Sequence, residues 1–300
     1  MLSILIPIHN YNVVTLVKEL LLQAKSIDGT IEIICCDDCS TDTQLKTENI
    51  NYLASQQIKL LENKTNIGRT KTRQLLANNA TYNWILFLDV DVIPALNSFL
   101  SIYISYINIK HDCIYGGLKY QEEQPEKEHL LRWVYGHQRE DIALQKRKTT
   151  PYKSIASGNI LIKKNLFLKI NQNLTQNWYG FDNFFSAQLK ELNSTIIHIN
   201  NKVYHIGLED NIDFLHKQEL ATYTIFKLYQ NNLFSNNHDN GLLKTFLKLK
   251  KLNLVLPYTY FYKCLKKTFK RNLLGNSPKL YYLDLYRLGY FCTLNTYKNA

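Results

Sequence analysis

An apolar segment at residues 84–88 ends abruptly in two carboxylates that are separated by one residue, Asp89 and Asp91. Five consecutive apolar residues are typical of a central strand covered on both faces, and Pro94 should keep that strand from continuing as a paired one. An isolated Asp-x-Asp more often marks a polar turn. At the carboxyl end of a central strand, however, open α/β sheets bind ligands. Two carboxylates placed there suit Mg²⁺ or Mn²⁺ bridging the phosphates of a nucleotide.

The segments before this strand alternate between strand-like and helix-like patterns. Buried strands are expected at residues 3–8, 31–36 and 58–61, and apolar residues recur at helical spacing over 13–24. Ser, Thr and Asp side chains at 40–42 can cap a second helix. This order predicts an α/β fold with a doubly wound, mostly parallel sheet and right-handed crossovers.

The rest of the chain predicts further elements of both kinds. Strands are expected at residues 113–118, 155–162, 195–199 and 202–205. Helices are expected at 95–108, inside the charged segment 120–153, at 180–192 and from 211 onward, with a polar break at 231–241.

The net charge of +11 lies in the last sixty residues. Residues 241–300 hold twelve Lys or Arg and a single acid, Asp284, so the preceding residues balance to zero. We expect no signal peptide, because the N-terminus has no basic segment followed by a long apolar one. Six cysteines with no second metal-ligand pair are read as reduced thiols. These features predict a cytoplasmic protein without a spanning helix.

Four motifs occur in one order, each at an expected strand end. They are residues 3–10 ending His9-Asn10, residues 32–42 with Asp37-Asp38, Asn66-Ile67-Gly68 with Arg73, and Asp89-Val90-Asp91. This series resembles the inverting family 2 glycosyltransferases of GT-A fold, over roughly residues 1–210. Later segments extend the resemblance: Ser157-Gly158-Asn159, Tyr179 to Asn183, and Val203 to Gly207.

The resemblance implies a transferase with a nucleotide-binding half at residues 1–92 and an acceptor half at 93–210, followed by a helical basic extension at 211–300. The substrates would be a nucleotide-sugar, expected to be a UDP-sugar, and a glycan or lipid-linked glycan acceptor in the synthesis of polysaccharide or cell-surface glycan. The cofactor would be Mn²⁺ or Mg²⁺, which neutralises the charge on a leaving nucleoside diphosphate.

The resemblance also implies a role for each residue of the donor site. Asp91 is the expected direct metal ligand, Asp89 would contact metal, ribose or water, and His205 would complete the metal site. The nucleotide would also be bound by residues near its base and phosphates: Pro7, His9, Asp37, Asp38 and Arg73. His9 departs from the family, which more often has Thr or Tyr there.

The acceptor side also departs from the family at one position. An inverting transfer needs a base that deprotonates the acceptor hydroxyl. The family usually has Glu followed by Asp or Asn, whereas this chain has Asp182-Asn183, so the base assignment rests on Asp182 alone. Asp is equally favoured as a helix N-cap. Trp178, Tyr179 and Asn183 are the expected acceptor contacts, with core aromatics as the alternative for the first two.

The basic extension alternates lysines with leucines and aromatic residues over 242–291. Basic amphipathic helices of this kind suit an anionic membrane surface, so residues 241–300 could hold the enzyme on the inner face of the cell membrane. The alternative is a solvated face covering the catalytic core. No nucleic-acid recognition motif accompanies the charge, and no nucleic-acid partner is expected.

Two further function classes stay open. A nucleotidyltransferase would share the sheet and a metal-binding carboxylate, but residues 9–12 contain no glycine for its early phosphate loop. A non-catalytic nucleotide-binding or membrane-associated scaffold derived from a transferase is kept open by the departure at Asp182-Asn183.

Overall fold

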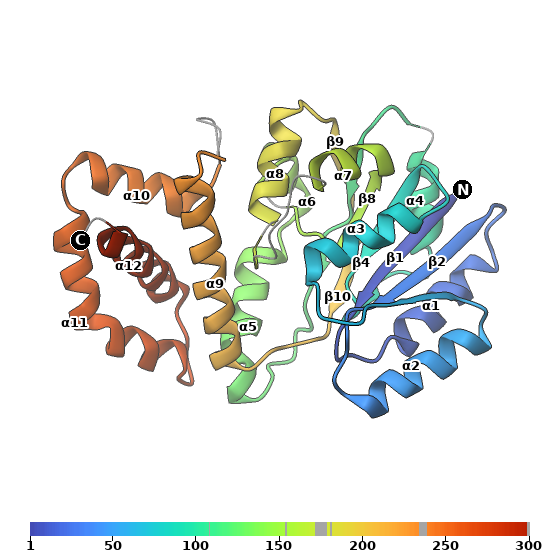
Figure 1. The fold of residues 1–300 in the computed structure, drawn as a ribbon, viewed down its shortest axis with the longest axis horizontal. Helices are drawn as coiled ribbons and strands as arrows, with labels where there is room; N and C mark the ends of the chain where they lie inside the picture. Colours follow the sequence, from blue (N-terminus) through green and yellow to red (C-terminus); the bar gives the residue numbers. More distant parts are fainter. Residues whose placement is uncertain (108, 154, 172–178, 181, 234–238, 299–300) are drawn as a thin grey trace. The chain divides into compact units, whose positions relative to one another are not determined.

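A computed structural model describes residues 1–300 except 108, 154, 172–178, 181, 234–238 and 299–300. The chain divides into two compact units (Figure 1). Unit 1 comprises Met1–Gln121, Asp141–Asn177 and Leu192–Gly207, and unit 2 comprises Glu122–Glu140, Trp178–Glu191 and Leu208–Ala300. Two stretches that the sequence analysis placed in the first domain, 122–140 and 178–191, thus belong to unit 2. The domain boundaries expected from the sequence stay a prediction.

Unit 1 is built on a seven-stranded sheet of order β3-β2-β1-β4-β8-β6-β9. Its strands are β1 (Leu2–Ile8), β2 (Ile31–Asp37), β3 (Lys59–Glu62), β4 (Trp84–Leu88), β6 (Cys113–Tyr115), β8 (Asn159–Lys163) and β9 (Ile196–His198). β1 pairs in parallel with β2 and β4, whereas β8 is antiparallel to both β4 and β6. The predicted α/β class with a mostly parallel sheet is confirmed.

Helices cover this sheet in unit 1 (Figure 1). They are α1 (Val14–Ala24), α2 (Thr43–Ser55), α3 (Arg69–Asn79), α4 (Phe99–Ile107), α6 (Leu144–Thr149) and α7 (Lys164–Asn171). The predicted cap of the second helix is present, since the Asp42 side chain accepts a hydrogen bond from the Leu45 amide at 3.0 Å. Every residue of β4 is buried, as expected for a strand covered on both faces.

A second, three-stranded sheet in unit 1 corrects two expectations. It consists of β5 (Val92–Pro94), β10 (Val203–His205) and β7 (Leu118–Lys119). Pro94 was expected to end strand pairing, but it pairs with Val203 as the last residue of β5. The single strand expected at 113–118 is two strands in different sheets, because Gly116 and Gly117 separate β6 from β7 and Gly117 has a positive φ of 99°.

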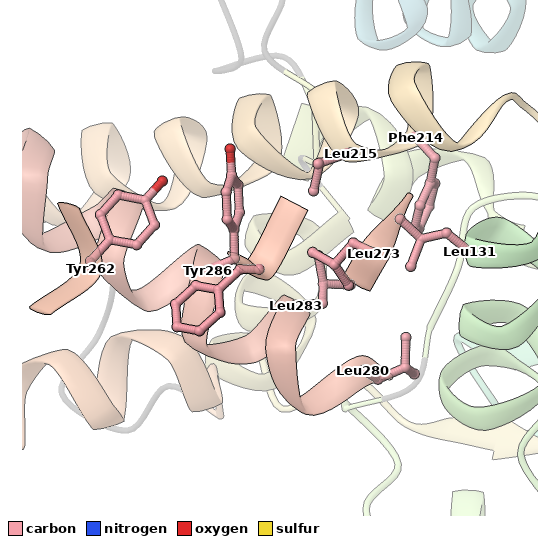
Figure 2. Packing of buried hydrophobic residues seen from close by; sticks show 9 residues of the cluster. Leu131, Phe214, Leu215, Tyr262, Leu273, Leu280, Leu283 and Tyr286 are labelled. Carbon is pink, nitrogen blue, oxygen red and sulfur yellow. The ribbon is translucent and has the colours of Figure 1, made fainter. Parts of the chain in front are cut away.

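Unit 2 is helical among its described residues. It contains α5 (Leu130–Tyr135), α8 (Asp182–Glu191), α9 (Asn211–Gln230), α10 (Gly241–Lys251), α11 (Val255–Leu273) and α12 (Leu280–Lys298), with a 3₁₀ turn at Lys127–His129 and a π turn at Gly136–Glu140. Figure 2 shows one of its cores, in which Tyr262 and Leu273 of α11 lie near Leu283 and Tyr286 of α12. A Cβ at Gly289 would come within 2.2 Å of the Tyr262 ring, so glycine allows α11 and α12 to approach closely.

Candidate functional site

The carboxyl ends of β1, β2 and β4 meet at one edge of the sheet in unit 1. Ile8 at the end of β1 pairs with Asp37 at the end of β2, and Leu5 of β1 pairs with Phe87 of β4. Pro7 lies beyond the part of β1 that pairs with β4, so its missing amide does not interrupt that pairing. The loops that follow these three strands therefore emerge side by side and carry the candidate nucleotide-binding residues.

Asp38 organises the loop before α3. Its carboxylate is buried and accepts hydrogen bonds from Asn63 Nδ2 at 2.9 Å, from the Ile67 amide at 2.9 Å and from the Gly68 amide at 2.8 Å. Gly68 has a positive φ of 81° and precedes α3 directly. Asp38 thus fixes the turn from which the arginines of α3 extend. Its expected contact with a nucleobase stays a prediction.

Asp37 is equally engaged within its own loop. It accepts hydrogen bonds from the amide and the hydroxyl of Ser40, and Lys46 Nζ lies 3.4 Å from its Oδ2. His9 approaches the same loop, with Nδ1 3.1 Å from the Asp38 carbonyl oxygen. His9, which the sequence assigned to the nucleotide, therefore joins the loop after β1 to the loop after β2.

Asn10 strengthens this junction and was not among the candidate residues. Its Oδ1 accepts hydrogen bonds from the Thr41 amide at 2.8 Å and the Asp42 amide at 3.2 Å, and its own amide donates to Ser40 Oγ at 2.9 Å. Asn10 has a positive φ of 49°, a conformation that asparagine tolerates better than most residues. The conformation and the side-chain bonds together explain an asparagine at this position.

Two arginines of α3 hold the carboxylate of Asp89. Arg73 Nη2 donates to Asp89 Oδ1 and Arg69 Nη2 donates to Asp89 Oδ2. Burial alone would raise the pKa of Asp89, but the charges of Arg69 and Arg73 outweigh it and hold the pKa below its usual value. Asp89 is therefore ionised, and two guanidinium groups lie beside its negative charge. The sequence motifs indicate Arg73 but not Arg69, whose only signal is its place on a basic helix.

Asp91 lies beside His205 at one end of the small sheet of unit 1. Asp91 Oδ2 lies 3.4 Å from His205 Nε2, and the Asp91 carbonyl accepts a hydrogen bond from the Ile206 amide at 2.9 Å. Tyr120 stacks on the His205 ring with centroids 5.4 Å apart and planes at 25°. The antiparallel pairing of β5 with β10 brings the two together, because His205 pairs with Val92, next to Asp91.

The environment of Asp91 differs from that of Asp89. Burial raises the pKa of Asp91 above its usual value, and the negative charge of Asp89 adds to that shift although His205 opposes it. The negative charge of Asp91 in turn adds to the effect of burial in raising the pKa of Tyr11. Asp89 and Asp91 thus have different surroundings: Asp89 lies beside guanidinium groups and Asp91 beside an imidazole.

Asp91 and His205 fit a divalent cation better than Asp89 does. Over the described ranges, no group of three or more His, Cys, Asp and Glu side chains is arranged to hold a metal. The pair offers one oxygen and one imidazole nitrogen, a donor set that suits Mn²⁺. Asp89 is directed to Arg69 and Arg73 instead.

The candidate acceptor residues lie in unit 2. Asp182 is the first residue of α8, a position that favours an acidic side chain through the helix dipole. Asn183 donates to the Gly180 carbonyl at 3.4 Å and accepts from Asn240 Nδ2 at 3.2 Å, and Lys217 Nζ lies 6.0 Å from the Tyr179 ring centre. Trp178 lies outside the described residues. The roles assigned to these side chains stay predictions.

Comparisons with known proteins show what this chain is similar to. A family model described as "Glycosyl transferase family 2" matches residues 3–170. An uncharacterized glycosyltransferase of Haemophilus influenzae (strain ATCC 51907 / DSM 11121 / KW20 / Rd) is 31% identical over 93 residues. That match covers 30% of this chain and 29% of the relative, so the chain spans under a third of the relative's length.

Two solved structures share the fold. A mannosyltransferase from Pyrobaculum calidifontis, in complex with GDP-Man and Mn²⁺, is 11% identical with a TM-score of 0.59 and covers 100% of this chain and 88% of its own. Glucosyl-3-phosphoglycerate synthase from Mycobacterium tuberculosis, in complex with Mn²⁺, UDP and glucosyl-3-phosphoglycerate, is 13% identical with a TM-score of 0.50. The match covers 79% of this chain and 81% of the synthase chain. At these identities the likeness concerns the GT-A architecture alone.

Proposed function

Because the chain belongs to glycosyltransferase family 2, we propose that it is a metal-dependent inverting enzyme that moves a sugar from a nucleotide-sugar to a glycan or lipid-linked glycan. The observation that carries the metal dependence is the pair formed by Asp91 and His205, whose facing atoms are 3.4 Å apart beside β4. The resulting role is in polysaccharide or cell-surface glycan synthesis. The family assignment makes a nucleotidyltransferase and a non-catalytic scaffold the weaker alternatives.

The metal site in this proposal consists of Asp91 and His205, with Mn²⁺ or Mg²⁺ as the ion. A bound divalent ion would neutralise the charge that develops on the leaving nucleoside diphosphate. Tyr120 orients the His205 ring by stacking on it. Asp89, held by Arg69 and Arg73, would accept a hydrogen bond from the ribose and leave the ion to Asp91.

The nucleotide would lie over the loops that follow β1 and β2. Pro7 and His9 shape the first loop, and Asp37 and Asp38 set the second, where a uracil N3–H would find an acceptor. Arg73 supplies positive charge near the phosphates. UDP is the proposed nucleotide on these grounds, although the similar solved structures were obtained with both UDP and GDP-Man.

The acceptor half of the proposal rests on Asp182. A carboxylate at the start of α8 can take the proton from the attacking hydroxyl while the helix dipole stabilises its charge. Tyr179 offers an aromatic face on which a sugar ring can stack, and Asn183 offers an amide for its hydroxyl groups. Trp178 completes the proposed set.

The basic extension supports a further element of the proposal, peripheral attachment to the inner face of the cell membrane. Along the described chain, no helix combines the length and apolarity that crossing a bilayer requires. Residues 241–300 carry all of the excess positive charge, and each basic residue near an anionic bilayer contributes about 1 kcal/mol of attraction. A lipid-linked acceptor would then be presented at the same surface.

The experiment that tests the donor site is a thermal-shift panel of UDP-, GDP-, dTDP- and CMP-sugars, each with Mn²⁺ and with EDTA. A ligand at about 100 times its dissociation constant stabilises the folded protein by about 2.7 kcal/mol, which such an assay detects. A shift that requires both Mn²⁺ and one nucleotide class, and that Asp91→Ala abolishes, supports the proposal. A shift that is equal in EDTA overturns its metal dependence.

A further inference from the structure

The turn between α10 and α11 exposes an unusual amount of apolar surface. Leu252, Leu256 and Tyr260 are 64%, 67% and 74% exposed, and Leu254 lies between them at 43%. Figure 1 shows α10 and α11 joined at this short turn. We call these four residues the α10–α11 corner. Most exposed leucines in a soluble domain occur singly, so four large apolar side chains within nine residues require a physical reason.

The corner is not left over from a poorly formed core, because each of the two helices buries apolar side chains on another face. Leu243 and Phe246 of α10 are buried in one cluster, and Tyr262 and Phe269 of α11 are buried in the other. The apolar residues of each helix have therefore been divided between an inner face and an outer one. The buried clusters of unit 2 therefore form without the side chains of the corner.

Basic side chains adjoin the corner on both helices. On α11, Leu256 and Tyr260 are followed at helical spacing by the exposed Lys263, Lys267 and Arg271, so one stripe begins apolar and ends basic. On α10, Lys248 and Lys251 are exposed just before the corner.

Acidic residues are nearly absent from this part of the chain. Within residues 241–300 the only acid is Asp284, and Arg139 already pairs with it at 2.6 Å. Other lysines of these helices have partners of their own: Lys244 pairs with Asp239 at 3.3 Å, and Lys250 donates to the Tyr229 hydroxyl at 3.0 Å. Basic groups therefore outnumber acidic ones around the corner, and this excess of positive charge favours an anionic partner.

We propose that the α10–α11 corner inserts into the interface of an anionic lipid bilayer, with its leucines among the acyl chains, Tyr260 at the boundary with the headgroups and the adjacent lysines on the lipid phosphates. An aromatic ring at the boundary and lysines beside it are the arrangement that interfacial helices use. This inference rests on the membrane element of the proposed function and locates it at four named side chains.

The observations favour lipid over the other anionic or apolar partners. Tyr260 is the one aromatic ring of the corner and its three leucines offer no stacking surface, whereas single-stranded nucleic acid binds by stacking successive bases on aromatic side chains. A second copy of this chain would bring two strongly basic surfaces together, and like charges would oppose that contact. A bilayer of anionic lipid is the partner that meets the apolar corner and the basic flanks together.

Cys264 provides a direct probe of insertion, because it is exposed on α11 one turn after Tyr260. Cys35, Cys36, Cys113 and Cys292 are buried and Cys39 is half-buried, so a polarity-sensitive fluorophore should react first at Cys264. Vesicles containing phosphatidylglycerol should shift the emission to the blue and intensify it, whereas pure phosphatidylcholine vesicles should not. Cys264→Ser should remove the signal, and a label that gives no blue shift on bound vesicles overturns the insertion.

Vesicle sedimentation separates insertion from simple charge attraction. The pair Leu256→Glu and Tyr260→Glu should lower partitioning onto phosphatidylglycerol vesicles by about tenfold or more, since charged groups are disfavoured at the acyl boundary. Leu22→Glu is the matched control, because Leu22 is 63% exposed on α1 of unit 1. The proposal is overturned if vesicle partitioning falls equally in the corner variant and in Leu22→Glu, or if it falls in neither. It is also overturned if a DNA duplex at low salt displaces the labelled protein from the vesicles completely.

The donor assay keeps this inference distinct from the proposed transferase activity. The corner variants should retain the Mn²⁺- and nucleotide-dependent thermal shift of the unaltered protein, because none of the substituted residues lies in unit 1. If the corner variants retain the thermal shift and bind vesicles as the unaltered protein does, membrane insertion by the corner is rejected and the donor site is not. Vesicle binding that depends on the corner, in a protein with no shift for any nucleotide-sugar, supports the corner and rejects the donor site.

Discussion

Gly207 lies directly against the carboxylate of Asp91: a Cβ atom on Gly207 would come within 2.6 Å of Asp91 Oδ2 and 2.8 Å of Asp91 Cβ. A side chain at residue 207 must therefore displace either the carboxylate or the backbone that follows His205. Gly158 has the same relation to Asp89, with a Cβ only 2.6 Å from Asp89 Oδ2. Each carboxylate after β4 thus rests on a residue that has to be glycine.

We predict that Gly207→Ala lowers Mn²⁺ affinity by about 10- to 100-fold, the range seen when support of a metal ligand is disturbed. The reason is that Asp91 must move to admit the methyl group. Titration of Mn²⁺ by calorimetry or by electron paramagnetic resonance measures the change. Gly241→Ala is the matched control, because a Cβ there meets no atom within 4 Å. Unchanged Mn²⁺ affinity in Gly207→Ala would remove Asp91 from the metal site.

Arg69 leads to a prediction with two opposite effects. Arg69→Gln removes one of the two positive charges beside Asp89, so the site becomes more negative. A change of one charge near the surface is worth about 1 kcal/mol, or roughly fivefold in affinity. Mn²⁺ alone should therefore bind more tightly, whereas the Mn²⁺-dependent binding of a nucleotide-sugar should weaken because positive charge near the diphosphate is lost.

Isothermal titrations of the ion and of the nucleotide-sugar measure these two effects separately. Arg69→Lys keeps the charge and should leave both affinities within about twofold, since the Coulomb term is retained. Changes of the same sign for both ligands in Arg69→Gln would show that the residue supports the structure of the loop and not its charge.

Asp182 carries the prediction about catalysis. Asp182→Asn should retain donor binding but lower the rate of transfer by about 10²- to 10⁴-fold, the usual contribution of a general base. The rate is measured by the nucleoside diphosphate that is released as the sugar moves to the acceptor or to water. Glu191→Gln makes the same chemical change at the other end of α8 and should leave the rate unaltered. Normal transfer by Asp182→Asn would reject the base assignment.

The central sheet was predictable because its signals are local and strong. β4 is a continuous apolar run, β1 and β2 are largely apolar and mostly buried, and each of the three ends at a polar turn. Their carboxyl ends meet at one edge, so the sequence alone could place Asp89 near Asp38. The strand β5 has three residues and is too short to show a period. For that reason Pro94 was taken for a strand terminator although it pairs in the second sheet.

The contacts that shape the candidate site were less accessible to sequence reasoning. Arg69 and Asp89 are twenty residues apart, and Asp89 does not belong to the helix that carries Arg69. The sequence of a basic helix does not indicate which carboxylate its arginine will contact. The stacking of Tyr120 on His205 depends on a second sheet that the sequence did not predict. Gly207 was noticed as part of a motif, but only the packing shows that it adjoins Asp91.

Arg147 gives a prediction about stability. It is almost fully buried, and its guanidinium donates to the carbonyl oxygens of Tyr115, Gly116 and Ile199 at 2.9–3.2 Å, joining the ends of β6 and β9. Arg147→Met should lower the free energy of unfolding by about 2–4 kcal/mol, because buried carbonyls lose their donors. Urea unfolding measures the change.

The control for this substitution is Arg139→Met, which removes an exposed ion pair with Asp284. That pair should contribute less than about 1 kcal/mol. A loss in Arg147→Met no greater than the loss in Arg139→Met would mean that water or other donors satisfy the carbonyls once the guanidinium is gone.

Asp112 gives a prediction about acid stability. Burial alone would raise its pKa, but hydrogen bonds from Lys163 and Thr195 lower the pKa to about 2. An aspartate in the unfolded chain titrates near about 3.9, so the folded protein gains stability from the ionised form at neutral pH and loses it as the pH falls from about 4 toward about 2. Asp112→Asn should therefore destabilise unit 1 at neutral pH, and its difference from the unaltered protein should shrink as the medium is acidified through that window. Urea unfolding at neutral pH and at about pH 3 measures the two differences. A difference that stays constant would mean that Asp112 acts through hydrogen bonds that its neutral form makes equally well.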